Sequence, residues 1–367
     1  MPSSLAIAGG GPRRVVVLAL FCTLAACTST VTVPSPSPAA TPGVAAVTTA
    51  TPTPTSTATP RQVRPFDRVV PLTLPPELGA AVDRDRIAFT DAGALHVLEV
   101  TAGQRRSVYP IPAGWGLELS PRGLRGDALV FGLTRIEGQR TDGRVLRLDL
   151  RTNAVATIDE WSGPFLGGGD GWRPQAPVTN ETDILWIRVT AEAQPFSAEV
   201  MLAAGNARPR SIWTVPSVVW ADLHDTGRVA ISTLITQRDR AELVYWTAGA
   251  ISSAGDRPSP DGGPVLFVGS DVFWGVGPRT VRDITAGELV GPTGARRRID
   301  LQPDCGWVGG TSRHLHLVCR ASQSGSAVLL DPLSGVRDAI PTSLLIAGHG
   351  AALWREGTQW WLGMLAP

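Results

Sequence analysis

The sequence contains no lysine. All 33 of its basic residues are arginine, against 32 acidic residues and five histidines. This absence excludes two kinds of chemistry, because a P-loop needs a lysine on the nucleotide phosphates and a Schiff base needs a lysine amine. The formal net charge of +1 also argues against nucleic acid, since phosphate binding needs a clustered positive surplus. The one dense basic run, Arg296 to Arg298, is more simply a solvated strand edge than an anion site.

Short catalytic and metal-binding motifs are also missing. The chain has no Gly-x-Ser-x-Gly, His-Glu-x-x-His or Cys-x-x-Cys sequence and no EF-hand loop. We therefore assign no catalytic residue, no metal ligand and no cofactor from the sequence.

The first 27 residues have the parts of a secretory signal. Arg13 and Arg14 precede an apolar run from Val15 to Ala26, which is too short to span a bilayer and ends in Leu-Ala-Ala-Cys27. This ending resembles the lipobox of bacterial lipoproteins, in which the cysteine is acylated and becomes the first mature residue. The resemblance implies a signal peptide over residues 1–26 and a lipid on Cys27. It places the protein on the extracytoplasmic side of a cell membrane; the alternative is an ordinary secreted protein with an incidental cysteine.

Few cysteines remain after the signal. With Cys22 removed and Cys27 acylated, only Cys305 and Cys319 are left, which suits an oxidising compartment. A hairpin that turns at residues 310–313 would set these two opposite each other on adjacent strands. We therefore predict a disulfide between them.

Residues 27–62 are predicted to be a tether. From Thr28 to Pro60 the chain carries no charge and contains 11 Thr, 7 Pro and 4 Ser. Such a composition cannot bury enough apolar surface to fold, and proline biases it toward an extended form. The tether would hold a domain off the membrane.

Residues 63–367 are predicted to be an all-β domain. Two clear hairpins, residues 87–100 and 352–364, each join apolar strands through a short turn that contains glycine. A small-residue turn also recurs after what we take as the third strand of each unit, where glycine or asparagine would supply a positive φ. These turns are Thr101-Ala102-Gly103, Arg151-Thr152-Asn153, Ala203-Ala204-Gly205, Thr247-Ala248-Gly249, Thr285-Ala286-Gly287 and Leu333-Ser334-Gly335.

The spacing of these turns predicts a β-propeller. Units of about 40 to 50 residues with four short strands are typical of propeller blades. Six turns give six blades, and the final hairpin gives a seventh that lacks its fourth strand. The extended run Phe66 to Leu74 would complete it and close the ring, with Pro71 tolerated because that strand is outermost.

The domain resembles the bacterial β-propeller superfamily. Ser259-Pro260-Asp261-Gly262 is similar to the Ser-Pro-Asp-Gly turn of TolB-like repeats, and Ser120-Pro121-Arg122-Gly123 is a weaker copy. A Trp-Asp dipeptide, typical of WD40 repeats, is absent, as is the tryptophan motif of quinoprotein dehydrogenases. The resemblance is therefore to a TolB-like or WD40-like fold at the level of the superfamily.

Two histidine-containing clusters could hold a metal. Asp222, His224 and Asp225 form the densest titratable group, but Asp225-Thr226-Gly227 has the composition of an ordinary turn, which we favour. His314 and His316 lie two residues apart on one face of a strand, where packing between blades or exposure is more common than chelation.

A ligand site is expected on the loops that cross between blades. Most of the 12 tryptophans, including Trp186, Trp246, Trp274 and Trp354, fall in strands and should pack between blades. Trp115, Trp161 and Trp172 instead flank expected crossing loops, and Asp170 lies in a glycine-rich tract among them. Exposed rings beside a carboxylate can stack on sugar or peptide groups, although the same rings could cap blade edges.

The sequence thus favours a membrane-anchored binding or scaffold protein. We expect a monomer with a protein, peptide or glycan partner and no nucleic acid. The alternative is an extracytoplasmic hydrolase or lyase that acts on carbohydrate at the channel mouth, for which Asp159, Glu160 and Asp170 are the clustered candidates.

Overall fold

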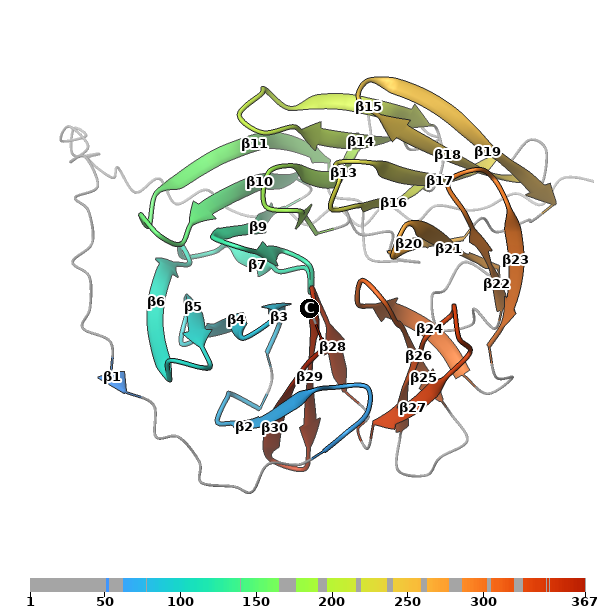
Figure 1. Cartoon of the computed structure of the whole chain (residues 1–367). Coiled ribbons are helices and arrows are strands. Elements are labelled where there is room, and N and C mark those ends of the chain that lie inside the picture. The colour runs from blue at the N-terminus through green and yellow to red at the C-terminus, as the bar shows by residue number, and fades with distance from the viewer. Residues whose placement is uncertain are drawn as a thin grey trace, which may run out of the picture. The chain divides into compact units, whose positions relative to one another are not determined.

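The computed structural model in Figure 1 describes residues 51–52, 62–76, 78–138, 140–164, 176–190, 197–215, 219–235, 240–258, 263–276, 286–301, 305–319, 326–340, 342 and 344–366. The chain divides into two units, residues 1–47 and 48–367, and every described residue belongs to the second. The described residues form 30 strands and no helix. Accordingly, no helix in this part of the chain is long and apolar enough to cross a membrane.

Seven antiparallel sheets are arranged around a common axis, which confirms the seven-bladed propeller (Figure 1). Each blade has four strands, and the first strand of blade 2 is split into two short pieces. From the axis outward, the strands are β3 (Ala80–Asp83), β4 (Arg86–Asp91), β5 (Ala94–Glu99) and β6 (Gln104–Pro110) in blade 1; β7 (Gly116–Glu118) with β8 (Leu124–Arg125), β9 (Ala128–Glu137), β10 (Arg140–Asp149) and β11 (Val155–Pro164) in blade 2; β12 (Val178–Thr179), β13 (Ile184–Thr190), β14 (Ser197–Ala203) and β15 (Arg210–Val215) in blade 3; and β16 (Val219–Leu223), β17 (Val229–Ile235), β18 (Arg240–Thr247) and β19 (Ala250–Pro258) in blade 4.

The remaining blades follow the same order. They consist of β20 (Val265–Val268), β21 (Asp271–Val276), β22 (Ala286–Val290) and β23 (Arg296–Asp300) in blade 5; β24 (Cys305–Gly310), β25 (Leu315–Cys319), β26 (Ser326–Leu330) and β27 (Arg337–Ile340) in blade 6; and β28 (Leu345–Ala347), β29 (Ala351–Glu356), β30 (Gln359–Met364) and β2 (Arg68–Leu72) in blade 7. A two-residue strand, β1 (Thr51–Pro52), also pairs with the outer edge of β6.

Blade 7 is closed as the sequence predicts. Strand β2 pairs antiparallel with β30, from Arg68 opposite Met364 to Leu72 opposite Trp360. Just before β2, the ring of Phe66 stacks on Trp354 with centroids 5.3 Å apart. The start of the folded region therefore supplies the outermost strand of the last blade.

Five of the six predicted turns follow a third strand. These turns contain the residues with positive φ that the sequence predicts, with φ of 62° at Gly103, 57° at Asn153 and 78° at Gly335. The fifth assignment was wrong: Ala286 and Gly287 begin β22, and the turn lies at residues 291–295, where Gly294 has a φ of 84°. Gly287 is required for packing instead, because a Cβ there would lie 2.3 Å from the ring of Phe273.

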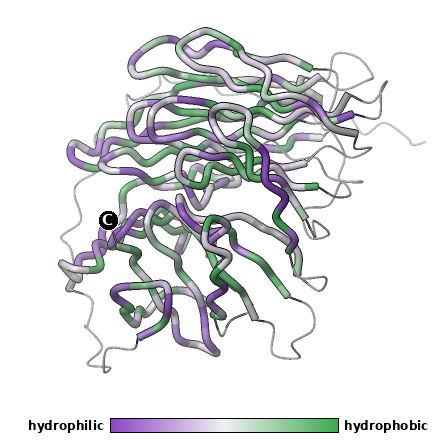
Figure 2. The backbone as a smooth tube through the Cα atoms, turned by 45° about the vertical axis from the view of Figure 1, so that its right-hand side comes forward, coloured by the Kyte–Doolittle hydropathy of each residue, from purple (hydrophilic) through white to green (hydrophobic). Residues whose placement is uncertain are grey.

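The core lies between neighbouring blades. Hydrophobic residues follow the inner and middle strands in Figure 2, whereas hydrophilic residues are common at turns and on outer strands. The four tryptophans expected between blades are all buried: Trp186, Trp246, Trp274 and Trp354. Each blade contributes both faces of its sheet to these clusters, so the ring holds together through blade-to-blade contact.

The two faces of the ring carry different connections. We call the turn face the side with the links between first and second strands and between third and fourth strands, such as residues 84–85 and 100–103. We call the crossing face the opposite side, which carries the links between blades, such as residues 111–115.

Cys305 and Cys319 form a disulfide across blade 6. They lie directly opposite each other in the β24–β25 ladder, and both are buried. The bond therefore links the innermost strand of the blade to its neighbour.

Removing this disulfide is expected to cost about 3 kcal/mol of unfolding free energy, the entropic estimate for a loop of about 15 residues. Urea denaturation of Cys305→Ser/Cys319→Ser would measure it, with the reduced wild type as a control for the thiols. A midpoint equal to that of the oxidised wild type would contradict the expectation.

Candidate functional site

A loop of blade 2 extends into the centre of the ring. Between β7 and β8, residues 119–123 leave the innermost strand and bring Arg122 to the axis. The Arg122 guanidinium forms an ion pair with Asp222 on β16 of blade 4, and its Nη2 donates to the carbonyl of Leu223 at 2.9 Å. The second oxygen of Asp222 accepts a hydrogen bond from the backbone N–H of Phe267 in blade 5 at 2.7 Å. The two charged side chains are only 9% and 5% exposed.

The same loop also contacts the two blades next to blade 2. The carbonyl of Pro121 accepts from Val82 N in blade 1 at 3.0 Å, and the carbonyl of Arg122 accepts from Thr179 N in blade 3 at 3.2 Å. His349, from the turn between β28 and β29 of blade 7, places Nε2 3.0 Å from the Thr179 carbonyl. Because one loop reaches blades 1, 3 and 4, it occupies the axis near the turn face.

His349 is held neutral at this position. It is 1% exposed, and burial lowers its pKa well below the usual value, assisted by the positive charges of Arg122 and Arg125. The axial polar groups thus form a buried, hydrogen-bonded network. Sequence reasoning missed this network, for which the only signal was the unusual Arg in Ser120-Pro121-Arg122-Gly123. The matching Ser259 to Gly262 lies outside the described residues.

Asp222, His224 and Asp225 do not form one site, because each has different partners. Asp222 points to the axis, whereas His224 begins the turn before β17, with Gly227 N donating to its carbonyl at 2.9 Å. Asp225 pairs with Arg125 at 3.1 Å. No group of three or more potential metal ligands occurs in the part of the chain that the structure describes. The turn interpretation accounts for residues 224–227, but it missed the role of Asp222.

His314 and His316 are packed inside the ring. They are 8% and 5% exposed, and β25 begins at Leu315. Burial is the largest cause of the lowered pKa of each, to about 3 for His316. Both histidines are therefore packed between strands, as one of the two interpretations favoured over chelation in the sequence analysis predicts.

Trp115 lies on a connection between blades, as expected. It is half-buried at the end of the link from β6 to β7, and the guanidinium carbons of Arg135 and Arg144 lie 5.1 and 4.6 Å from its ring centre. Arg144 in turn pairs with Glu160 at 2.8 Å. The ring is therefore part of a charged surface at the crossing face of blade 2.

Trp161 does not lie on a loop. Strand β11 continues to Pro164, so Trp161 is within the outermost strand and packs toward blade 3 beside Trp186. A Cβ at Gly143 would lie 2.1 Å from its indole, so the glycine lets the ring lie flat across the sheet. Trp161 thus faces away from Trp115, and the placement on a crossing loop was wrong. Ligand binding by these residues stays a prediction.

Asp159 and Glu160, the two described carboxylates among those considered for catalysis, do not converge. Asp159 accepts from Trp186 Nε1 at 3.1 Å on the blade 3 side of β11, whereas Glu160 pairs with Arg144 on the blade 1 side. The other two candidates of this region, Asp170 and Trp172, lie outside the described residues.

The basic run on β23 joins blades together. Arg296 donates to the carbonyl of Ala254 in blade 4 at 2.8 Å, and Arg297 reaches the carbonyls of Pro332 and Leu333 in blade 6. Arg298 remains at the surface and pairs with Asp300. All three arginines are exposed on the outermost strand of blade 5, which confirms the solvated-edge interpretation; Arg296 and Arg297 in addition donate to backbone carbonyls of the neighbouring blades.

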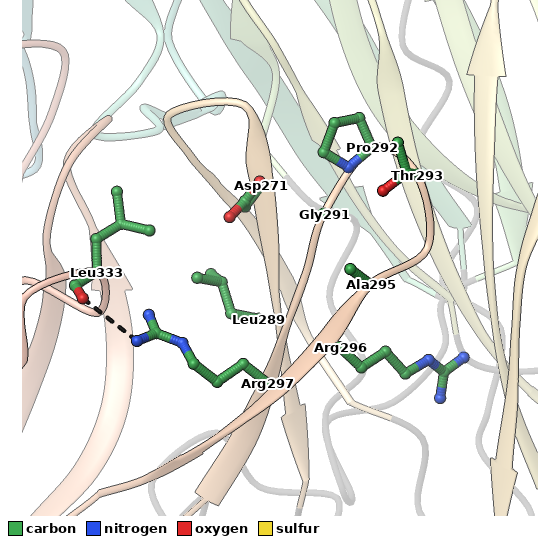
Figure 3. Close-up of a pocket in the computed structure, with 9 residues that line it drawn as sticks. All are labelled: Asp271, Leu289, Gly291, Pro292, Thr293, Ala295, Arg296, Arg297 and Leu333. Carbon is green, nitrogen blue, oxygen red and sulfur yellow. Dashed lines mark hydrogen bonds between the residues drawn. The ribbon is translucent and has the colours of Figure 1, made fainter.

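A shallow pocket of about 420 Å³ lies beside this run (Figure 3). Its lining comes from Asp271, Leu289, residues 291–293, Ala295, Arg296, Arg297 and Leu333. Figure 3 shows Arg297 directed toward the Leu333 carbonyl, where its 3.3 Å hydrogen bond crosses from blade 5 to blade 6. The guanidinium is thus engaged by protein.

The chain matches no protein-family model and no curated protein. Its fold is similar to that of oligogalacturonate lyase from Vibrio parahaemolyticus, with a TM-score of 0.54 and 11% identity over 84% of this chain and 96% of that one. It is also similar to the β-propeller domain of the Trilobed protease from Pyrococcus furiosus, with a TM-score of 0.52 and 10% identity over 79% and 97% of the two chains. TolB from Acinetobacter baumannii matches at a TM-score of 0.41 and 9% identity over 72% and 65%.

These likenesses show the fold alone, and the TolB match is too distant to carry an argument. The chain is a β-propeller protein. The β-propeller fold expected from the sequence is thereby confirmed.

Proposed function

We propose that the chain is a lipid-anchored, extracytoplasmic protein whose propeller is a binding module for a protein, peptide or glycan. The Leu-Ala-Ala-Cys27 sequence and the uncharged Thr/Pro tether support the anchor. The observation that carries the binding role is the state of the polar groups at the axis. Arg122 and Asp222 at the axis form an ion pair with each other and hydrogen bonds with backbone groups. These two side chains therefore have a structural role and are not available to a ligand. Partners are therefore expected on the crossing face or the outer wall.

The anchor is tested by Cys27→Ser. We expect the wild type to incorporate labelled palmitate and to sediment with membranes, and the variant to do neither because it has no acylated thiol. Cys22→Ser is the matched control, since that residue is removed with the signal and should leave both results unchanged. Membrane sedimentation of an unlabelled wild type would contradict the lipid anchor.

The binding surface is tested by tryptophan substitutions. Trp115→Ala removes a ring on the link from β6 to β7, and Trp172→Ala removes a ring that the sequence alone predicts on a crossing loop. Trp161→Ala instead removes a ring that packs toward blade 3. Cross-linking in intact envelopes should recover a partner with wild type and Trp161→Ala but at least tenfold less with the other two, an order-of-magnitude expectation for losing a stacked aromatic contact. Equal recovery with all four proteins would contradict a crossing-face site.

The alternative, a carbohydrate hydrolase or lyase, has less support. The likeness to oligogalacturonate lyase extends only to the fold, and Asp159 and Glu160 point to opposite faces of β11. We therefore favour binding over catalysis.

A further inference from the structure

Hydrogen bonds on the turn face link nearly every pair of neighbouring blades. The links come from backbone groups and side chains in or beside the turns of this face. They are Arg86 to Asp127 for blades 1 and 2, Arg147 to the Glu181 carbonyl for blades 2 and 3, Asn180 to the His224 carbonyl for blades 3 and 4, His224 to the Gly269 carbonyl for blades 4 and 5, Gly269 N to the Ser312 carbonyl for blades 5 and 6, and Arg84 N to the His349 carbonyl for blades 1 and 7.

Blades 6 and 7 are the exception. Among the described turn-face connections of these two blades, residues 311–314, 331–336 and 348–350, no hydrogen bond or ion pair joins one blade to the other. On the crossing face, Thr342 donates to the Arg355 carbonyl at 2.6 Å. We call the contact between blades 6 and 7 the seam; on the turn face it depends on apolar packing.

The seam is an apolar cluster. Blade 6 contributes Ala327, Leu329 and Ile340, and blade 7 contributes Leu345, Ala347, Ala352 and Trp354 together with Val69 of the closing strand. Blade 7 is also the blade assembled from both ends of the folded region. The chain still joins β27 of blade 6 to β28 of blade 7 when these blades separate, whereas β2 is held in blade 7 only by pairing and packing.

His316 faces this seam from blade 6. Its neighbours along the strand, Leu315 and Leu317, belong to the cluster between blades 5 and 6, so alternation directs His316 to the other side. Directly opposite His316 on β26 lies Leu329, a member of the seam cluster. The His316 side chain is buried, and its Nε2 has no hydrogen-bond partner.

We propose that the ring opens at the seam when the surroundings become acidic, and that protonation of His316 drives the opening. A protonated imidazole would place an unpaired charge in apolar surroundings, which is strongly unfavourable. Opening of the seam exposes the His316 imidazole to water and relieves this cost. The seam is the contact least able to resist, because its turn face lacks the polar links of the other blade pairs.

Charged groups near the seam do not neutralise His316. On β26, Leu329 lies directly opposite His316, and on β27, Asp338 lies directly opposite Leu329. Asp338 is therefore two strands from His316, or about 10 Å at the usual strand spacing. Glu356 on β29 accepts from Trp354 Nε1 at 3.0 Å. Arg313, Asp331 and Asp338 influence the pKa of His314, whereas burial alone lowers that of His316 to about 3.

The direction of the effect follows from these pKa values. In the closed ring His316 stays neutral down to a pH of about 3, whereas an exposed histidine binds a proton near pH 6.5. The open form therefore binds more protons between these values, and acid favours it. The opening equilibrium constant should rise about 25-fold between pH 7 and pH 5.

Hydrogen exchange of the secreted chain with Cys27→Ser tests the proposal. Separation of blades 6 and 7 leaves their sheets packed on one face only, so we expect local unfolding of these two blades to accompany opening. Protection factors, which correct for the intrinsic pH dependence of exchange, should therefore fall about 25-fold at pH 5 in peptides from β25, β26, β29 and β30. Peptides from β9, β13 and β17 should keep their protection. His316→Leu, of similar volume and without a titrating group, should abolish the fall, and His96→Leu in blade 1 should retain it.

Each other outcome overturns the proposal. A fall spread evenly over all blades would remove the seam as the opening point, and unchanged protection at pH 5 would remove the opening itself. An equal fall in wild type and His316→Leu would remove His316 as its cause. Should His316→Leu fail to fold, His316→Met provides the same comparison with a more adaptable side chain.

Discussion

Asp222→Ala is expected to lower the free energy of unfolding by about 3 to 5 kcal/mol, the usual cost of removing one partner of a buried ion pair. The substitution leaves the Arg122 guanidinium without its carboxylate at a site where that side chain is only 9% exposed. It also deprives the backbone N–H of Phe267 of its acceptor. Urea denaturation, followed through the buried tryptophans, would measure the loss.

Two further variants separate charge from packing. Arg122→Met/Asp222→Ala removes both charges, and we expect it to cost clearly less than the sum of the single substitutions because no buried charge is left unpaired. Arg298→Ala is the matched control, since its pair with Asp300 is 75% and 71% exposed and solvent screening should leave it little effect on stability. Additive losses, or an Asp222→Ala loss equal to that of Arg298→Ala, would contradict a stabilising axial network.

The fold could be predicted from the sequence because its signals are local. Alternating apolar strands and left-handed turn residues recur within each blade, and Gly103 and Gly335 have the positive φ that the pattern requires. The error at Gly287 has a physical cause: the same small residue serves a turn in one blade and makes room for Phe273 in another. Composition alone cannot separate these two uses of glycine.

The axial network could not be predicted in the same way. Arg122 and Asp222 are 100 residues apart, and they meet because a loop of one blade crosses the axis to another. The role of Trp161 was missed for a related reason. Strand β11 is an outer strand with little apolar alternation, so the sequence did not reveal that it continues to Pro164 or which side the ring faces.

Deletion of the closing strand is expected to have the largest effect of all. A chain that begins at Leu74 lacks β2 and the buried residues Val63, Phe66, Val69 and Leu72. At about 1.5 to 3 kcal/mol for each buried side chain, the loss is about 6 to 12 kcal/mol, comparable to the entire stability of a typical domain. The exposed edge of β30 would also be open to pairing with other chains. We expect no cooperative unfolding transition and a strong tendency to aggregate.

The matched control is a chain that begins at Gln62, which keeps β2 and should unfold like the full secreted chain. A synthetic peptide of residues 62–74 should restore a cooperative transition to the shortened chain, because β2 is joined to the other strands of blade 7 only through pairing and packing. The same peptide with Phe66→Ala should rescue poorly, since it lacks the ring that stacks on Trp354. A stable monomer without residues 62–73 would show that the ring closes by other means, for then the pairing of β2 with β30 could not be what completes blade 7.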